Sequence, residues 1–281
     1  MDPDFSLTRP REVRAYLAAI GFSPSKSMGQ NFLVDAHMRD LILDASGVSA
    51  GDRVVEVGPG LGVMTEGLLG RAEAVTAIEL DFRLSEHLQQ RFSDVRNLTL
   101  IHGDATKTDW PPLLRPDPVR VISNLPYSVG SRILYDLANP VWAPLSVTVM
   151  LQSDVADRLL APAGSGLYGL LTVRMSWMFE VQRIRQVPGL CFLPPPKVGS
   201  SVVHLQRREQ PPMELRDTDL FEKLCRFAFT RRRKQLRGIV KDFGYDPTRL
   251  SLDLTRRPET LDLKAWAELA NQLAEKTRRF S

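Results

Sequence analysis

The chain of 281 residues is poor in cysteine and histidine and has no long apolar run. Its two cysteines, Cys191 and Cys225, are expected to pack as small apolar side chains, which fits a reducing cytoplasm. Its four histidines are scattered without the spacing of metal ligands, so no metal site is predicted. No stretch approaches the roughly 20 apolar residues of a membrane span, and Met1 to Asp4 lacks the features of a signal peptide.

The composition is that of an ordinary soluble protein, with 43% apolar and 25% charged residues. The length allows one large domain, or a domain with a small annex. A net charge of +4 permits an anionic partner but does not identify one. We therefore expect a cytoplasmic protein, a monomer by default, with no membrane partner and no metal.

A glycine-rich turn stands between a strand and a helix. Arg53 to Val57 is a β-branched run that predicts a buried strand, and Gly58-Pro59-Gly60-Leu61-Gly62 follows directly. Glycines let a ligand approach the backbone, and the N–H groups that open the next helix point toward it. The spacing Gly-x-Gly-x-Gly is tighter than that of dinucleotide-binding turns. It suits adenosine that carries a sulfonium amino acid and no phosphate.

Acidic residues stand at the ends of the next two predicted strands. Glu79 ends the strand Ala74 to Glu79, and at this distance from a glycine-rich turn its carboxylate can accept both hydroxyls of a ribose. Asp104 follows the strand Leu98 to His102 and can accept a hydrogen bond from the N6 amine of a cofactor's adenine. The alternatives are a solvated acid for Glu79 and a turn-forming aspartate for Asp104.

The tetrapeptide Asn124-Leu125-Pro126-Tyr127 follows a fourth predicted strand, Val119 to Ser123. Pro126 cannot donate to a sheet, so the chain turns at the carboxyl end of the strand, where ligands bind in α/β sheets. Asn124 and the carbonyls of the turn offer acceptors, and Tyr127 offers a ring for stacking. This set suits a planar exocyclic amine such as adenine N6. The alternative is an ordinary proline turn.

Two other segments could lie near a ligand. Lys26 to Leu33 is a polar loop with a sudden apolar pair, and its residues alone favour a linker. Phe192 to Val198 contains three prolines and is stiff, so it could hold Phe192 over a cleft; a rigid connector with Phe192 in the core is an equal alternative. Further strands are predicted at Ser146 to Leu151, Val181 to Val187 and Ser201 to Leu205.

A compositional break at Gln206 to Pro212 predicts a domain boundary. We place a first domain at residues 1–208 and a second at residues 209–281, which shows only helical periodicity. The second domain contains a run of positive charges that is either a solvated face or a phosphate-binding surface. The candidate phosphate-binding residues are Arg231, Arg232, Arg233, Lys234 and Arg237.

Taken together, these motifs resemble the ribosomal small-subunit RNA adenine dimethyltransferases over about Lys26 to Gly238. The motifs are Gly29-Gln30-Asn31-Phe32-Leu33, Glu56-Val57-Gly58-Pro59-Gly60-Leu61-Gly62, Glu79-Leu80-Asp81, Gly103-Asp104-Ala105, Asn124-Leu125-Pro126-Tyr127, Phe192-x-Pro194-x-Pro196-Lys197-Val198 and Arg232-Arg233-Lys234-x-Leu236-Arg237. The resemblance implies an α/β fold: a Rossmann-like class I methyltransferase domain with a seven-stranded, mostly parallel sheet, followed by a small all-helical domain.

The resemblance also implies a reaction. S-adenosylmethionine would be the cofactor, and 16S rRNA in a 30S subunit or its precursor would be the partner. Two methyl groups would be transferred to N6 of each of two adjacent adenines in the 3′-terminal hairpin, and the basic run would bind the RNA.

Roles for single residues follow from the same resemblance. Asn124, Leu125 and Tyr127 would hold the target adenine, in the turn that Pro126 imposes, and Phe192 would stack on its other side. The loop that begins at Gly29 would cover the cofactor. The cofactor contacts would be Asn31, Leu33, Gly58, Gly60, Glu79, Asp104 and Asn124.

Two residues depart from the family pattern. Gly238 stands where many members have Asn, and Ser153 where Lys is usual, and both would face the RNA. Three alternatives stay open: a 23S rRNA adenine methyltransferase of the macrolide-resistance type, a non-catalytic assembly or transcription factor, and a nicotinamide dehydrogenase. The basic motif disfavours the 23S enzyme. The intact Asn124 tetrapeptide, together with Glu79, disfavours a non-catalytic factor. The glycine spacing disfavours a dehydrogenase.

Overall fold

The computed structural model describes residues 6–25 and 28–277, and contacts divide the chain into two compact units. The sheet unit comprises residues 1–156 and 180–207, and the helical unit comprises residues 157–179 and 208–281. The expected boundary after residue 208 lies close to the second division, but residues 157–179 group with the C-terminal segment. That the two parts act as separate domains stays a prediction.

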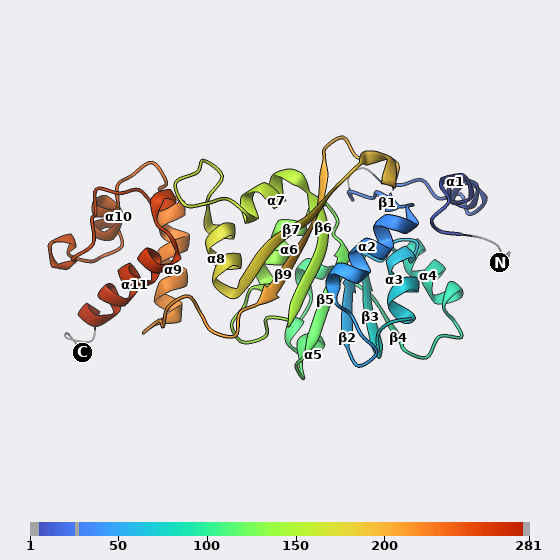
Figure 1. Cartoon of the computed structure of the whole chain (residues 1–281), viewed down its shortest axis with the longest axis horizontal. Coiled ribbons are helices and arrows are strands. Elements are labelled where there is room, and N and C mark those ends of the chain that lie inside the picture. The colour runs from blue at the N-terminus through green and yellow to red at the C-terminus, as the bar shows by residue number, and fades with distance from the viewer. Residues whose placement is uncertain (1–5, 26–27, 278–281) are drawn as a thin grey trace. The chain divides into compact units, whose positions relative to one another are not determined.

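The sheet unit is built on seven strands in the order β4-β3-β2-β5-β6-β9-β7 (Figure 1). Strands β2 to β6 run parallel to one another, and β9 is antiparallel to β6. The predicted Rossmann-like, mostly parallel sheet of seven strands is confirmed. The strands are β2 (Arg53–Val57), β3 (Ala74–Glu79), β4 (Leu98–His102), β5 (Val119–Asn124), β6 (Ser146–Gln152), β7 (Phe179–Val187) and β9 (Ser200–Arg207).

The strand order reverses between β2 and β5, which lie side by side although β3 and β4 separate them in the chain. Val55 of β2 is opposite Val121 of β5, so both strands run to the same edge of the sheet. Ligands of open α/β sheets bind in the crevice at such a reversal, beyond the carboxyl ends of the strands. The turn at Gly58 and the residue Asn124 both stand there.

Helices cover both faces of this sheet. From β2 to β4 the chain moves toward one edge of the sheet, and from β5 to β6 it moves toward the other edge. Because crossovers between parallel strands are right-handed, α3 and α4 lie on one face and α6 lies on the opposite face (Figure 1). The helices that begin in the sheet unit are α1 (Pro10–Ala19), α2 (Ala36–Ser46), α3 (Val63–Leu69), α4 (Phe82–Arg91), α5 (Trp110–Leu114), α6 (Gly130–Leu137) and α7 (Ser153–Leu159).

The sequence predicts helix caps at Asp35 and Thr8, because short polar side chains can accept from the first N–H groups of a helix. Asp35 caps α2 as expected, because its carboxylate accepts from the N–H of Met38 at 2.8 Å. The expected cap of α1 at Thr8 is wrong. The helix is preceded by Arg9, and the Thr8 hydroxyl is instead 2.9 Å from that of Ser6.

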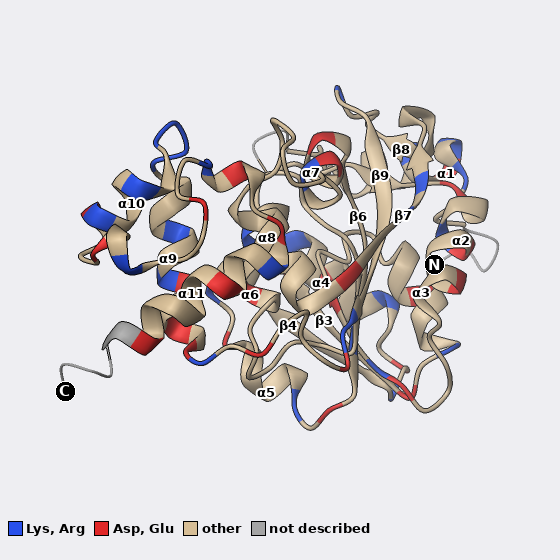
Figure 2. Ribbon diagram, turned by 60° about the vertical axis from the view of Figure 1, so that its left-hand side comes forward, with Lys and Arg blue, Asp and Glu red and all other residues tan. Residues whose placement is uncertain are grey.

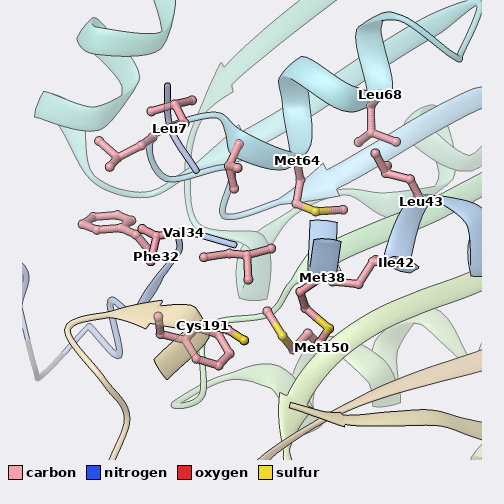
Figure 3. Close-up of a cluster of buried hydrophobic side chains, with 14 of the residues drawn as sticks. Leu7, Phe32, Val34, Met38, Ile42, Leu43, Met64, Leu68, Met150 and Cys191 are labelled. Carbon is pink, nitrogen blue, oxygen red and sulfur yellow. The ribbon is translucent and has the colours of Figure 1, made fainter. Parts of the chain in front are cut away.

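The core of the sheet unit joins α2 and α3 to the sheet (Figure 3). Ile42 and Leu43 of α2 pack with Leu68 of α3 and Met150 of β6, all at most 1% exposed. Cys191 is buried in the same cluster and Cys225 in the helical unit, and both are free thiols, as the sequence predicts.

A second, small sheet lies beside this core. β1 (Phe32–Leu33) pairs antiparallel with β8 (Phe192–Leu193), with Leu33 opposite Phe192. All four side chains are buried. The segment first interpreted as a linker is therefore fastened to the proline-rich segment. Its first two residues, 26–27, lie outside the described residues.

Strand β7 forms one edge of the large sheet. Its first and last residues, Phe179 and Val187, are buried. Between them the strand has four exposed polar side chains, those of Glu180, Gln182, Arg185 and Gln186. The sheet thus ends in a polar edge. The strands predicted at Val181 to Val187 and Ser201 to Leu205 are present as β7 and β9, which are neighbours in the sheet.

The helical unit contains no strand in residues 208–277, as predicted. Its helices α8 (Leu170–Met178), α9 (Thr218–Phe229), α10 (Leu236–Asp242) and α11 (Leu263–Thr277) surround a separate core. Trp266 is fully buried there, 5.5 Å from Phe229 between ring centroids. None of the described helices is both long and apolar enough to cross a membrane.

Candidate functional site

A cavity of about 210 Å³ lies in the sheet unit, at the carboxyl ends of β2, β3, β4 and β5. It is the place that the strand reversal predicts. All of the predicted cofactor residues line it, and so does the whole tetrapeptide. These lining residues are Asn31, Leu33, Gly58, Gly60, Glu79, Asp104, Asn124, Leu125, Pro126 and Tyr127.

The glycine-rich turn forms one wall because its backbone adopts a form that other residues rarely take. Gly58 and Gly60 have φ of +66° and +61°. A Cβ on Gly58 would lie 3.2 Å from Pro126, and one on Gly60 would lie 3.1 Å from Phe32. Side chains at these positions would be strained and would crowd the turn, so glycine keeps the wall bare for a ligand.

Glu79 lies at the end of β3 with its carboxylate almost fully buried. One oxygen accepts from the N–H of Gly60 at 3.0 Å and the other from that of Asp81 at 2.9 Å. Burial raises the pKa of Glu79, and these hydrogen bonds oppose the rise. Each carboxylate oxygen can accept a second hydrogen bond, so both hydroxyls of a ribose could still be bound.

Asp104 has the turn-forming role that the sequence left open, and it also lines the cavity. One oxygen accepts from the backbone N–H and the hydroxyl of Thr106, at 2.9 and 2.7 Å, and this is the turn-forming role. These bonds lower the pKa of the carboxyl. The other oxygen lies 3.8 Å from the ammonium of the exposed Lys107. Because Asp104 also lines the cavity, that oxygen can accept from a bound amine.

Asn124 has its side-chain amide fixed by a backbone group. Its Nδ2 donates to the carbonyl of Asn31 at 3.0 Å. A carbonyl can only accept, so the nitrogen of the amide must face Asn31, and Oδ1 faces away from it. In the same turn the Pro126 carbonyl accepts from Val129 and Gly130, where α6 begins. The Leu125 carbonyl is therefore the second candidate acceptor.

Tyr127 is held from two sides. Its hydroxyl shares a hydrogen bond with that of Ser200, at the start of β9, and its ring is half-buried. Burial raises the pKa of its phenol, so the group stays neutral. The loop at Gly29 lies close behind, since a Cβ there would be 3.3 Å from the Tyr127 nitrogen. The ring is thus placed at the cavity wall without freedom to turn away.

The known proteins most relevant to this site are rRNA-modifying enzymes. The family described as ribosomal RNA adenine dimethylase matches residues 21–272. The chain belongs to this family. The predictions of family, of α/β fold and of enzyme class are confirmed, and the enzyme is an rRNA adenine dimethyltransferase.

Relatives that align over almost their whole length support the assignment. The ribosomal RNA small subunit methyltransferase A of Magnetococcus marinus is 39% identical, over 92% of this chain and 95% of the relative. The protein of that name from Pseudomonas putida is 38% identical, over 89% of this chain and 95% of its own.

Solved structures show the same fold. A dimethyladenosine transferase from Plasmodium falciparum has a TM-score of 0.71 at 24% identity, over 88% of this chain and 97% of its own. The 23S rRNA methyltransferase ErmE has a TM-score of 0.67 at 25% identity, over 87% of this chain and all of its own.

The family and the fold imply S-adenosylmethionine as the methyl donor of the enzyme. The cavity fits that molecule by its chemistry. The bare glycine wall lets a ligand lie against the backbone, and each oxygen of Glu79 can accept one further hydrogen bond. Buried carboxyl groups favour a ligand that carries positive charge. Among the described residues no group of His, Cys, Asp and Glu could hold a metal ion.

Phe192 is the one predicted catalytic residue that the structure does not bring to this cavity. It is 2% exposed in the core, on β8, and is absent from the cavity lining. This placement corresponds to the alternative that put Phe192 in a rigid connector. Its stacking on adenine stays a prediction.

Glu56 is a lining residue to which the sequence assigned no role. It is 1% exposed, is the residue before the last of β2, and accepts from the hydroxyl of Thr65 at 2.7 Å. Burial raises its pKa to about 8, and the charge of Glu79 adds to the rise. The signal in the sequence is a lone acid inside an apolar strand.

The basic run lies in the helical unit, where Figure 2 shows positive residues on and near α10. Residues Arg231 to Lys234 form a turn before α10, and of the candidate phosphate-binding residues only Arg237 is helical. Arg232 donates to the carbonyl of Gly166 at 2.8 Å, and Lys234 lies 2.9 Å from the Asp242 carboxylate.

We predict that Glu56 makes stability depend on pH. Its pKa is about 8 in the folded chain against an ordinary 4.5, so its contribution is complete below about pH 4.5 and is lost as pH rises through about 8. Glu56→Gln keeps an acceptor for Thr65 and cannot ionise. Denaturant unfolding at several pH values should show wild type losing up to a few kcal/mol relative to this variant in alkali. Parallel pH profiles would contradict the prediction.

Proposed function

We propose that the enzyme methylates N6 of two adjacent adenines in the 3′-terminal hairpin of 16S rRNA, giving N6,N6-dimethyladenosines. The observation that carries the proposal is the fixed amide of Asn124, which offers an acceptor in a cavity that also has the features of a nucleoside site. The choice of 16S rRNA rests on the relatives named as small subunit methyltransferases. We place the enzyme in the cytoplasm as a monomer acting on the 30S subunit or its precursor.

The cofactor would be held by residues at three strand ends. Glu79 would accept from its ribose, Asp104 from its adenine amine, and Gly58 and Gly60 would let it lie against the backbone. Asn31, in the loop that leads into β1, and Leu33 of β1 would cover it. When bound, S-adenosylmethionine supplies an electrophilic methyl group on a positively charged sulfur.

The tetrapeptide would prepare the adenine amine for attack. The lone pair of N6 is delocalised into the ring, which makes the amine a poor nucleophile. Acceptors on Asn124 and Leu125 would hold its hydrogens out of the ring plane, which weakens the delocalisation of the lone pair and frees it for attack, and Tyr127 would stack on the base. The amine can lose its proton after transfer, so positioning carries most of the catalysis and no strong base is required.

An adenine in a hairpin must reach this cavity unpaired. We propose that it is captured from a loop or flipped from its stack, since a base inside a helix cannot present N6 to a buried amide. A second transfer requires that the singly methylated amine enter again. The site must therefore accept a methyl group beside the acceptor of Asn124.

Within the basic run, the contacts separate two kinds of residue. Arg231 lies over the ring of Phe227 at 3.7 Å and near Asp242, and Arg232 and Lys234 are held as described above. Arg233 and Arg237 are exposed, and neither makes an ion pair with the residues that the structure describes. We propose that these two bind phosphates of the RNA, and that Arg232 mainly braces the loop at Gly166.

We predict that methyl transfer from labelled S-adenosylmethionine to 30S particles without adenine methylation yields N6,N6-dimethyladenosine in the 16S 3′ hairpin. Nucleoside analysis of the separated RNAs is the measurement. Label in 23S RNA alone would instead assign the enzyme to the 23S type. No label, with the cofactor still bound, would indicate an assembly factor.

We predict that Asn124→Ala lowers the rate of transfer by about 10²-fold or more while the cofactor still binds, because the variant loses the acceptor for N6. Single-turnover transfer and cofactor titration are the measurements. Ser128→Ala is the matched control, since Ser128 also lines the cavity but is given no role. A fully active Asn124→Ala enzyme would contradict the role of Asn124 as an acceptor for N6.

We predict that replacing Arg233 and Arg237 together by alanine reduces the slope of log K for RNA against log salt by about 1.4 to 1.8, as expected for two lost phosphate contacts. The control, Arg232→Ala, should change the slope less and should lower the free energy of unfolding. An unchanged slope in the double variant would mean that these arginines form a solvated face and do not bind phosphates.

A further inference from the structure

His87 joins the N-terminal helix to the glycine-rich turn. It lies on α4 and is 6% exposed. Its Nδ1 shares a hydrogen bond with the hydroxyl of Tyr16 on α1, and its Nε2 is 3.2 Å from the carbonyl of Leu61. Leu61 is itself a lining residue of the cavity. A line of two hydrogen bonds therefore runs from α1 to the cavity wall.

The direction of both hydrogen bonds follows from the carbonyl at one end. A carbonyl only accepts, so Nε2 must carry the hydrogen that faces Leu61. In the neutral ring Nδ1 is then an acceptor, and the Tyr16 hydroxyl donates to it. Burial lowers the pKa of His87, and the nearby charge of Arg91 adds to the effect, so the neutral ring is favoured. The tautomer is thus set by the glycine-rich turn.

Leu61 lies between two glycines of the turn and is itself 3% exposed. Its neighbours Gly60 and Gly62 have φ of +61° and +92°. As glycines, they have no side chains that could anchor the turn. The turn rests on α4, since a Cβ on Gly62 would lie 2.8 Å from Phe92 and 3.0 Å from Leu88. These contacts limit how near the turn can come to α4. His87 adds a directional bond that also limits how far it can leave.

We propose that His87 is a positioning residue for the cofactor site, which holds the glycine-rich turn in its ligand-ready form through Leu61, and that Tyr16 orients His87. The proposal deepens the proposed function, because it rests on the turn being a wall of the S-adenosylmethionine site. His87 does not line the cavity and is given no contact with the ligand. Its effect should appear in cofactor affinity and not in the chemical step.

The test compares three variants of the full chain by titration with S-adenosylmethionine. His87→Phe removes both hydrogen bonds and keeps a ring, and should raise the cofactor Kd about three- to ten-fold, as expected for a lost hydrogen bond. His87→Gln keeps a donor at the same reach and should restore affinity toward wild type. Tyr16→Phe removes one hydroxyl and should give a smaller rise. The kcat at saturating cofactor should stay unchanged in all three.

The controls separate positioning from packing. His204→Phe removes an imidazole that is 2.8 Å from the Thr148 hydroxyl on β6, away from the cavity lining, and should leave the Kd unchanged. Equal loss of affinity in His87→Gln and His87→Phe, or wild-type affinity in His87→Phe, would overturn the proposal. If His87→Phe does not fold, the other two variants decide. Wild-type cofactor affinity in Tyr16→Phe, together with reduced cofactor affinity in His87→Gln, would overturn the proposal. Failure of RNA methylation by wild type with normal titrations would reject only the proposed substrate.

Discussion

The hydrogen bond from Asn124 to the carbonyl of Asn31 determines which end of the amide a ligand meets. An amide can turn over at little cost unless a neighbour distinguishes oxygen from nitrogen, and a backbone carbonyl does so without ambiguity. The bond requires the loop before β1 to lie against the end of β5. The pairing of β1 with β8 keeps it there, so a strand end, a loop and the proline-rich segment contribute to one acceptor.

Two buried acidic side chains determine the charge preference of the cavity. Glu56 and Glu79 are both buried, and the charge of Glu79 adds to the cost of ionising Glu56. Glu79 is relieved by two backbone N–H groups, whereas Glu56 has one hydroxyl. Binding of a cation between such groups lowers that cost. The site therefore gains most from a ligand whose positive charge is part of its reactivity, as it is in a sulfonium.

Much of the site could be predicted because its residues stand at strand ends, which short β-branched runs reveal. Gly58, Glu79, Asp104 and Asn124 were found in this way, and all line the cavity. What could not be predicted depends on contacts between distant segments. Leu33 pairs with Phe192 in strands of only two residues, which are too short to show a periodic pattern in the sequence. In this pairing Phe192 is buried in the core. The link of Tyr16 to His87 and the partners of Arg232 are likewise long-range.

The polar edge at β7 has a consequence for self-association. An outer strand of nine residues presents unpaired backbone groups that could template a strand from another copy, a common route to aggregation. On β7 the side chains that would meet such a strand are Glu180, Gln182, Arg185 and Gln186, all exposed. Desolvating them would oppose the pairing. The sheet can therefore end in water without recruiting a second chain to extend it.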